Sequence, residues 1–323
     1  MGFVFEQEGR QGFMNLFKIE HEGDKLKSIF HVGGFAQNES SVPELIGKNH
    51  LQVGGWIFKR LSPNFPTELE PFVEKYIKTI TSQIPFLEEL NTTTLYLRIP
   101  SFDMDKKQAI DKVIADNKEK ILKTENLIID LRNNGGGSDG SFSNLLPILY
   151  TNPIRTVTEE FLSTKQNNQR FLDYLTEYKI DEGTQRWIRK ICDKLQNKVG
   201  EFVNPWEEPV SVKHFDTVFE YPQNVGIIIN EVCASTTEQF LLAAKQSKKV
   251  KLFGVTTRGA LDTGNQLDIV SPCKEFRLMY SHSRSLRIPD FMIDNIGLQP
   301  DYYLDKSIPQ YKWVNFVSEI LNQ

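Results

Sequence analysis

The sequence has few of the features that tie a chain to disulfides, membranes or nucleic acids. Its 323 residues include three cysteines, Cys192, Cys233 and Cys273, whose odd number and wide spacing match neither a disulfide framework nor a zinc site. No apolar run approaches the length of a membrane span. A net charge of −4 leaves no basic surface for nucleic acid or anionic lipid. We therefore expect no nucleic-acid partner and no membrane span, and the sequence implies no metal and no organic cofactor.

Motifs for nucleotide binding and for secretion are missing as well. There is no GxxxxGK[ST] phosphate-binding loop. The N-terminus, MGFVFEQEGRQ, lacks the basic, apolar and small-residue regions of a secretion signal. With 39% hydrophobic and 25% charged residues, the composition is that of a soluble globular protein with one large or two modest domains.

The stretch VGIIINEVCASTTEQF, residues 225–240, places a serine at the start of a helix. Its β-branched run predicts a strand buried on both faces, and the apolar residues from Phe240 onward predict a helix. Ser235 then lies where the first N–H groups of that helix are unpaired, which suits an anion or an oxyanion. The alternative is structural, because Ser235 and Glu238 also have the spacing of a capping box.

A second stretch, LIIDLRNNGGG at residues 127–137, is another buried strand that ends in polar residues and three glycines. Consecutive glycines permit positive φ and let backbone N–H groups line a pocket. Taken alone, consecutive glycines are more often a flexible turn than an anion-binding loop.

Together, DLRNNGGG (130–137) and NEVCASTTEQF (230–240) resemble the tail-specific, or C-terminal processing, serine peptidases. The tricorn-like branch and its relatives in Bacteroidetes are the most similar, through DLRNNGGGSDGSFSNLLPILYTNPIRTV, EFLSTKQNNQR and SRSLRIPDFMIDNIGLQPDYYLD. The resemblance covers about residues 95–305. It implies an α/β fold with the ClpP/crotonase-like superhelical core, which agrees with the repeated strand and helix patterns.

The resemblance also implies roles for individual residues. Ser235 corresponds to the nucleophile, and the N–H groups of Thr236 and of Gly135 or Gly136 would form the oxyanion hole. Attack of a hydroxyl on an amide carbon builds negative charge on the carbonyl oxygen, and fixed N–H donors stabilise that charge.

The general base is where the sequence departs from the family. Ala260 stands where the branch with a serine and lysine dyad has its lysine. Asp294 falls near the acidic residue of the tricorn-like branch, although a carboxylate in a loop also caps turns. None of the histidines lies in the context of that branch's catalytic histidine, and His282 is expected to be a strand-end surface residue. The chain therefore either begins after that histidine region or works without it.

The chain order predicts a β-rich N-terminal segment, residues 1–61, with an antiparallel sheet, followed by a protease-like core, residues 62–323. Helices are expected at 66–84, 105–122, 138–150 and 309–321, and a helical arm or lid at about 170–199. Strands are expected at 95–99, 127–131, 225–229, 250–254, 265–270 and 275–280.

The prediction for function is a serine-type endopeptidase acting on peptide or unfolded protein, although the activity of this chain by itself stays open. The alternative is a catalytically incomplete relative that binds extended peptide or a protein partner, because the sequence has neither the lysine nor the histidine. A coenzyme A enzyme of the crotonase type would share the oxyanion hole, but this sequence has no identifiable basic loop that could bind the nucleotide. The resemblance implies an exported, periplasmic bacterial protein, whereas the missing secretion signal is equally in keeping with a cytoplasmic one.

Overall fold

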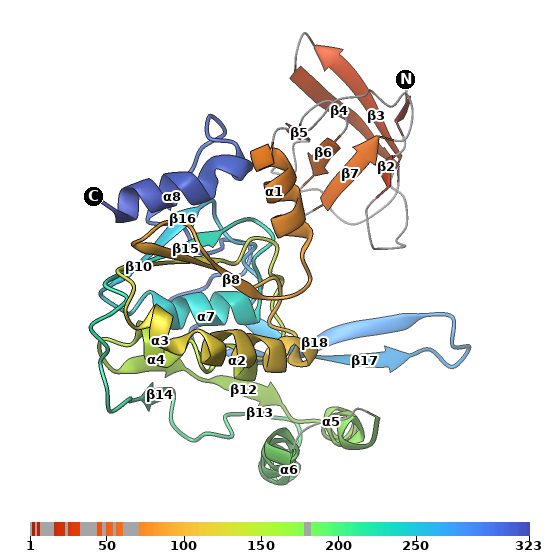
Figure 1. Cartoon of the computed structure of the whole chain (residues 1–323). Helices are drawn as coiled ribbons and strands as arrows, with labels where there is room; N and C mark the ends of the chain where they lie inside the picture. The colour runs from red at the N-terminus through yellow and green to blue at the C-terminus, as the bar shows by residue number, and fades with distance from the viewer. Residues whose placement is uncertain are drawn as a thin grey trace.

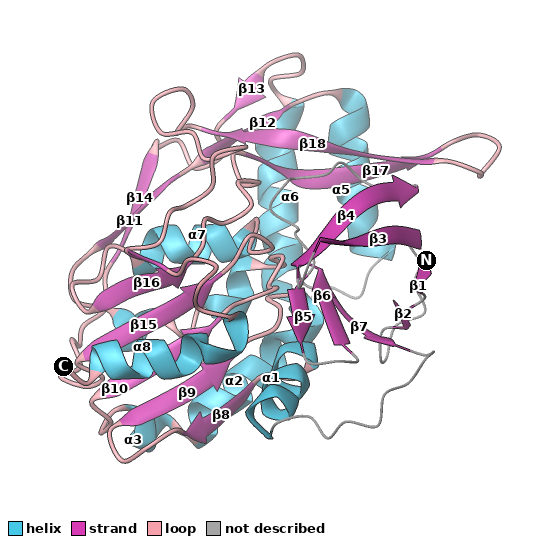
Figure 2. Cartoon of the chain, turned by 90° about the horizontal axis from the view of Figure 1, so that it is seen from above, coloured by secondary structure: helices cyan, strands magenta, loops and turns pink. Residues whose placement is uncertain are grey.

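A computed structural model describes residues 71–177 and 182–323 in full and, before residue 71, the strands alone. The centre is a six-stranded sheet of order β19-β16-β15-β10-β9-β8. Figure 2 shows the strands from β16 to β8 side by side. The strands are β8 (Phe86–Glu89), β9 (Thr94–Arg98), β10 (Asn126–Asp130), β15 (Asn224–Ile229), β16 (Val250–Gly254) and β19 (Tyr302–Tyr303). All neighbouring pairs are parallel except β8 with β9.

The two strands singled out in the sequence, β10 and β15, are adjacent in the middle of this sheet. Residues at alternating positions contribute to different hydrophobic clusters. Leu127 and Ile129 belong to the cluster that contains Phe240 of α7 (Thr236–Ala244), whereas Ile128 packs with Val317 of α8 (Trp313–Leu321). Burial on both faces explains why these strands are almost continuously β-branched or apolar.

Helices cover both faces of the sheet (Figure 1). One face carries α2 (Lys107–Asp116), α3 (Lys118–Ile121), η2 (Asp139–Phe142), α4 (Leu146–Leu149) and α7, and the other carries α8. Gly226 lets α8 approach β15, because a β-carbon there would lie 2.7 Å from Val317 Cγ1. This layered α/β architecture confirms the predicted fold class.

Several predicted helices are shorter than expected. The helix predicted at 105–122 begins with η1 (Met104–Lys106) and is divided at Asn117 into α2 and α3. The helix predicted at 138–150 is only η2 and the four-residue α4, because Gly140 and Pro147 disfavour a continuous helix. The helix predicted at 66–84 is α1 (Pro71–Thr81), while residues 66–70 lie outside the described part. The helix predicted at 309–321 comprises η3 (Gln310–Lys312) and α8.

A second sheet, of order β13-β12-β18-β17, lies beside the first. It contains β12 (Glu159–Leu162), β13 (Phe202–Val203), β17 (Thr263–Val270) and β18 (Arg277–Ser285), and β11 (Ile154–Val157) pairs separately with β14 (Val210–Lys213). The segment predicted as a helical arm forms α5 (Lys165–Glu177) and α6 (Glu182–Gln196). Both helices pack on this sheet through a cluster that includes Phe161, Phe171 and Leu195.

The described strands before residue 71 are antiparallel and form two small sheets of order β1-β3-β4 and β2-β7-β6-β5. They are β1 (Gly2–Phe3), β2 (Phe5–Glu6), β3 (Leu16–Glu22), β4 (Lys25–Val32), β5 (Glu44–Ile46), β6 (His50–Val53) and β7 (Trp56–Arg60). The predicted boundary at residue 61 lies outside the described residues. Within the described part, every helix is too short or too polar to span a bilayer.

Candidate active site

The glycine turn and the serine turn meet at one edge of the central sheet. β10 and β15 are parallel neighbours with Asp130 opposite Ile228, so the segments that follow both strands leave the sheet at the same edge. The N–H of Ala234 donates to the carbonyl of Asn134 at 3.3 Å. Residues about one hundred positions apart therefore form one surface, which the sequence resemblance implied but local patterns could not show.

Ser235 has a strained backbone at the start of α7. Its φ and ψ of 55° and −124° lie in a region that residues other than glycine seldom adopt. The side chain is exposed, although its neighbours in the chain are buried. An exposed serine on a strained turn between a strand and a helix is the arrangement of a nucleophile elbow.

Glu238 occupies the capping-box position, and its carboxylate binds the 257–260 loop as well as the start of the helix. Oε2 accepts from the N–H of Ser235 at 3.2 Å and from the N–H of Ala260 at 2.9 Å. Oε1 accepts from the Thr257 hydroxyl at 2.6 Å and from the Gly259 N–H at 2.8 Å. This buried side chain therefore fixes the 257–260 loop against Ser235, a role that the short capping motif alone did not indicate.

Gly136 is the residue of the glycine turn that lies against the serine. A β-carbon built on it would lie 2.9 Å from Ser235 Cβ and 3.0 Å from the Thr236 nitrogen, and its φ is +109°. Gly137 is equally constrained, because a β-carbon there would lie 2.2 Å from the Phe102 carbonyl carbon. At both positions a side chain would have to displace backbone.

Three backbone N–H groups were predicted to form the oxyanion hole. Thr236 is the first residue of α7, and neither its N–H nor that of Gly135 has a hydrogen-bond acceptor within the described part of the chain. The Gly136 N–H donates to Asn134 Oδ1 at 3.1 Å. Thr236 and Gly135 are therefore the donors that are free, and Gly136 would have to leave Asn134 to take part.

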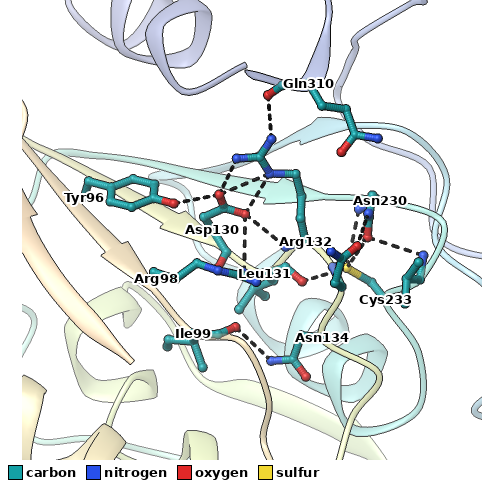
Figure 3. Close-up of polar contacts among 12 residues, drawn as sticks. Tyr96, Arg98, Ile99, Asp130, Leu131, Arg132, Asn134, Asn230, Cys233 and Gln310 are labelled. Carbon is teal, nitrogen blue, oxygen red and sulfur yellow. Dashed lines mark hydrogen bonds and ion pairs between the residues drawn. The ribbon is translucent and has the colours of Figure 1, made fainter. Parts of the chain in front are cut away.

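Asparagine side chains tie the two turns together (Figure 3). Asn230 Oδ1 accepts from the Asn133 N–H at 2.9 Å, and Asn230 Nδ2 donates to Asn133 Oδ1 at 2.8 Å. The Thr237 hydroxyl donates to Asn134 Oδ1 at 2.8 Å. Asn134 Nδ2 in turn donates to the carbonyl of Ile99 after β9. These buried contacts hold the glycine N–H groups and the serine in one fixed geometry.

An ion pair anchors the start of the glycine turn (Figure 3). Arg132 donates to both carboxylate oxygens of Asp130, with Nη2 at 2.5 Å and Nε at 3.0 and 3.1 Å, and both side chains are fully buried. The Tyr96 hydroxyl donates to Asp130 Oδ2 at 2.8 Å. Burial by itself raises the pKa of Asp130, but Arg132 and Arg98 outweigh that effect and lower the pKa to about 2. The DLR part of the motif therefore has a structural role.

Ala260 lies directly beside Ser235, whose N–H donates to the Ala260 carbonyl at 3.1 Å. The resemblance to the family placed a lysine base at this position, and the structure brings the position next to the serine. Because the side chain is a methyl group, it supplies no proton acceptor.

Asp294 binds backbone rather than a histidine in this structure. Oδ1 accepts from the N–H groups of Leu261 and Asp262 at 2.6 and 2.7 Å, and Oδ2 accepts from the N–H of Thr263 at 3.2 Å. The carboxylate thus holds the segment that continues from Ala260. This is the turn-capping alternative for Asp294, and it ties the segment that carries Asp294 to the residues that follow the 257–260 loop.

His282 is not the surface residue that the sequence predicted. It is 3% exposed and packs against Phe161 and Phe171 beneath α5, because the second sheet and its helices enclose this part of β18. Burial lowers its pKa, and its Nδ1 contacts the carbonyl of Asn265. His214, by contrast, is exposed beyond β14. In the described part of the chain, neither histidine forms a hydrogen bond with Ser235 or Asp294.

A comparison with protein families covers the region of both turns. A model of peptidase family S41 matches residues 93–304, a range that contains both turns, Ala260 and Asp294. The chain belongs to peptidase family S41. This is a family of serine peptidases, and its C-terminal processing and tricorn relatives are the group that the sequence resembles. No match was found among curated proteins.

Two solved structures with TM-scores of 0.50 share the fold. Mature CPAF complexed with lactacystin is 19% identical, with a TM-score of 0.50 over 71% of this chain and 51% of that one. A candidate peptidase from Parabacteroides merdae is 15% identical, with a TM-score of 0.50 over 78% of this chain and 69% of that one. A candidate S41 protease from Bacteroides fragilis is 13% identical, with a TM-score of 0.44 over 96% of this chain and 66% of that one. The chain spans about half the length of CPAF.

The sequence analysis did not identify two carboxylates near the serine turn of this S41 chain, Asp139 and Glu159. Asp139 reaches solvent but is surrounded by protein, which raises the pKa of its carboxyl, while the neighbouring Thr236 hydroxyl lowers it. Glu159, at the start of β12, accepts from Asn265 Nδ2 at 2.7 Å and from the Ser283 hydroxyl at 3.0 Å. Burial raises the pKa of Glu159, and Asp139 adds to this effect. Their partners come from distant segments, so no local motif marks either residue.

Proposed function

We propose that this chain is a serine-type endopeptidase that hydrolyses peptide bonds with Ser235 as the nucleophile. The strained, exposed conformation of Ser235 is the observation that carries the proposal. A residue that only capped α7 would not require a φ of 55°. Such strain persists only where the surrounding structure imposes it, here through Glu238, Ala260 and Gly136.

In the proposed reaction, the Ser235 oxygen bonds to the peptide carbonyl carbon and its proton passes to solvent. The carbonyl oxygen becomes negatively charged and accepts hydrogen bonds from the N–H groups of Thr236 and Gly135, with Gly136 leaving room for the substrate. The C–N bond then breaks, the amine leaves with a proton from solvent, and water releases the acyl group from Ser235. The N-terminal end of α7 adds a favourable electrostatic field. Such donors stabilise the tetrahedral intermediate more than the substrate, and this difference is the source of catalysis.

In this proposal, Asp294 acts through the backbone of residues 261–263. By holding this segment, it keeps Ala260 and the 257–260 loop in contact with Ser235. Asp294 is then a positioning residue for the serine turn. The proposed substrate is a peptide or an unfolded protein, because a hydrolytic site of this kind needs an accessible, extended main chain.

The test is covalent labelling with a fluorophosphonate, followed by intact-mass measurement. The chain should gain one label, and the Ser235→Ala variant should gain none. Ser211→Ala serves as a matched control, because it removes an exposed serine hydroxyl of β14 that lies outside both turns. Labelling that persists in Ser235→Ala, or no labelling of a chain whose circular dichroism shows it to be folded, would contradict the assignment of Ser235 as an activated nucleophile.

One observation favours a second function, that of a catalytically incomplete S41 protein that binds extended peptide. The residue beside Ser235 is Ala260, and neither His214 nor His282 contacts the serine. In that case an unfolded polypeptide would bind the folded chain without being cleaved, and Ser235→Ala would bind it equally well. Cleavage of casein followed by mass spectrometry, together with binding of the same casein to Ser235→Ala, distinguishes the two functions.

A further inference from the structure

A cavity of about 290 Å³ lies along the exposed side of α7. Its other walls are β11 and the segment from Arg287 to Leu298. Gln239 lines the cavity, and its N–H donates to the carbonyl of Ser235 at 3.0 Å, so the cavity begins one helical turn from the serine.

The floor of this cavity is apolar. Leu242 and Ala243 of α7 contribute to it, together with Val157, Phe291 and Leu298. Phe291 is 56% exposed, which is unusual for a large aromatic side chain beside a concave surface. Removal of this surface from water would favour binding of an apolar group.

The mouth of the cavity is cationic. Arg155 and Lys245 are exposed there, and no acidic residue contributes to the lining. The Arg155 guanidinium has no partner in the described part of the chain, whereas its backbone is fixed by Gln246, which exchanges two hydrogen bonds of 2.9 Å with it. The third cation, Arg287, is buried and paired with Asp262 at 3.0 Å, so its charge is already compensated.

We propose that this cavity binds a small amphipathic carboxylate. The carboxylate would pair with Arg155 and Lys245, and the apolar part would cover Leu242 and Phe291. At about 290 Å³, the cavity lies at the small end of ligand pockets, which are roughly 300–1,000 Å³ in volume, so the ligand must be small. Two sources share this chemistry: a short fatty acid, and the C-terminal residue of a peptide with an apolar side chain. The site goes beyond the proposed function, because binding here does not require the Ser235 hydroxyl.

The test is direct binding to the full chain, measured by isothermal titration calorimetry with hexanoate, hexylamine and hexan-1-ol. Hexanoate should bind saturably with one site, in the wild type and in Ser235→Ala alike, and more tightly than the amine or the alcohol. Arg155→Gln should weaken hexanoate about tenfold, as expected for the loss of one hydrogen bond to a charged group. Arg189→Gln is the matched control, because it removes an exposed arginine of α6 that is absent from the lining and should change nothing.

A variant of the floor tests the apolar contact separately. Phe291→Ala changes an exposed side chain, so the fold should be retained, and it should weaken hexanoate severalfold. N-acetyl-leucine, with its amide as the control that lacks a carboxylate, is compared with hexanoate to identify the source. Tighter binding of N-acetyl-leucine than of hexanoate assigns a peptide C-terminus. Tighter binding of hexanoate assigns a fatty acid. Equal binding of hexanoate and hexylamine, no saturable binding at millimolar concentrations, or an unchanged affinity in Arg155→Gln would overturn the proposal. None of these results depends on whether the chain is a peptidase.

Discussion

Gly136 and Ser235 are in contact across the two turns, with room for a hydrogen but not for a methyl group. A β-carbon on Gly136 would lie 2.9 Å from the β-carbon of Ser235 and from the carbonyl oxygen of Ala234. Only glycine satisfies both this spacing and a φ of +109°. The contact explains why the glycine motif and the serine motif occur together, although the chain separates them by about one hundred residues.

Gly136→Ala should therefore damage both the fold and the serine turn. We expect the free energy of unfolding, measured with urea, to fall by about 1–3 kcal/mol because of backbone strain and the clash. Fluorophosphonate labelling of Ser235 should be lost. Gly135→Ala is the control for stability, since no atom lies within 4 Å of its added β-carbon, and it should change the free energy of unfolding by less than about 0.5 kcal/mol. Normal labelling of Gly136→Ala would show that the close approach is not required.

Ala260→Lys should activate Ser235. The Ala260 side chain is exposed, and its backbone is fixed to Ser235 and Glu238 on either side, so an amine here would lie near the serine. General bases contribute about 10² to 10⁴ in rate, and a lysine that has not been optimised should raise the labelling rate at least tenfold. The rate should increase with pH as the lysine loses its proton. Ala260→Met, which has similar length but no amine, should not increase it. Equal labelling rates for Ala260→Lys and Ala260→Met would contradict the prediction that a lysine at this position activates Ser235.

The Asp130 carboxylate should make stability depend on acid pH. Its pKa is lowered to about 2, so the native state holds it ionised more strongly than the unfolded state, where about 3.9 is normal. The resulting stabilisation, about 2 kcal/mol, is complete above pH 5 and is lost as the pH falls toward 2. Urea unfolding at pH 5 and pH 3 measures the part of this loss that falls between those two pH values.

Asp130→Asn is the control for this pH dependence. At pH 7 it should cost about 3–5 kcal/mol, because Arg132 would keep a buried charge without its partner. The loss of stability between pH 5 and pH 3 should become smaller in the variant than in the wild type. The same slope in both proteins would mean that other carboxylates account for it.

Two substitutions at Asp294 separate backbone positioning from a role in orienting a base. Asp294→Ala leaves the N–H groups of Leu261 and Asp262 without their acceptor and should cost about 2 kcal/mol of stability and slow labelling. Asp294→Asn keeps one acceptor oxygen for these N–H groups, so both stability and labelling should lie closer to the wild type. A large loss of labelling in Asp294→Asn with unchanged stability would instead indicate that the charge of Asp294 orients a base.

The sequence predicted those parts of the protein that depend on local pattern. Continuous β-branched runs identified β10 and β15, because burial on both faces excludes polar residues, and the α/β class followed from the order of the elements. The family resemblance was confirmed by the match over residues 93–304. The roles of Ser235, Thr236, Gly135, Gly136 and Asp294 stay predictions, which the labelling experiments test.

Only the tertiary structure determined which side chains distant in sequence contact one another and which are buried. Glu238 had the spacing of a capping residue, yet three of its partners lie in the 257–260 loop. The sequence predicted that His282 is a surface residue, but the second sheet and α5 enclose it in the structure. The cavity along α7 combines residues from three segments and has no signature in any of them. Hydrogen bonds and burial depend on distance in space, whereas sequence patterns report only the neighbours along one strand or helix, so these relationships became visible only in the folded chain.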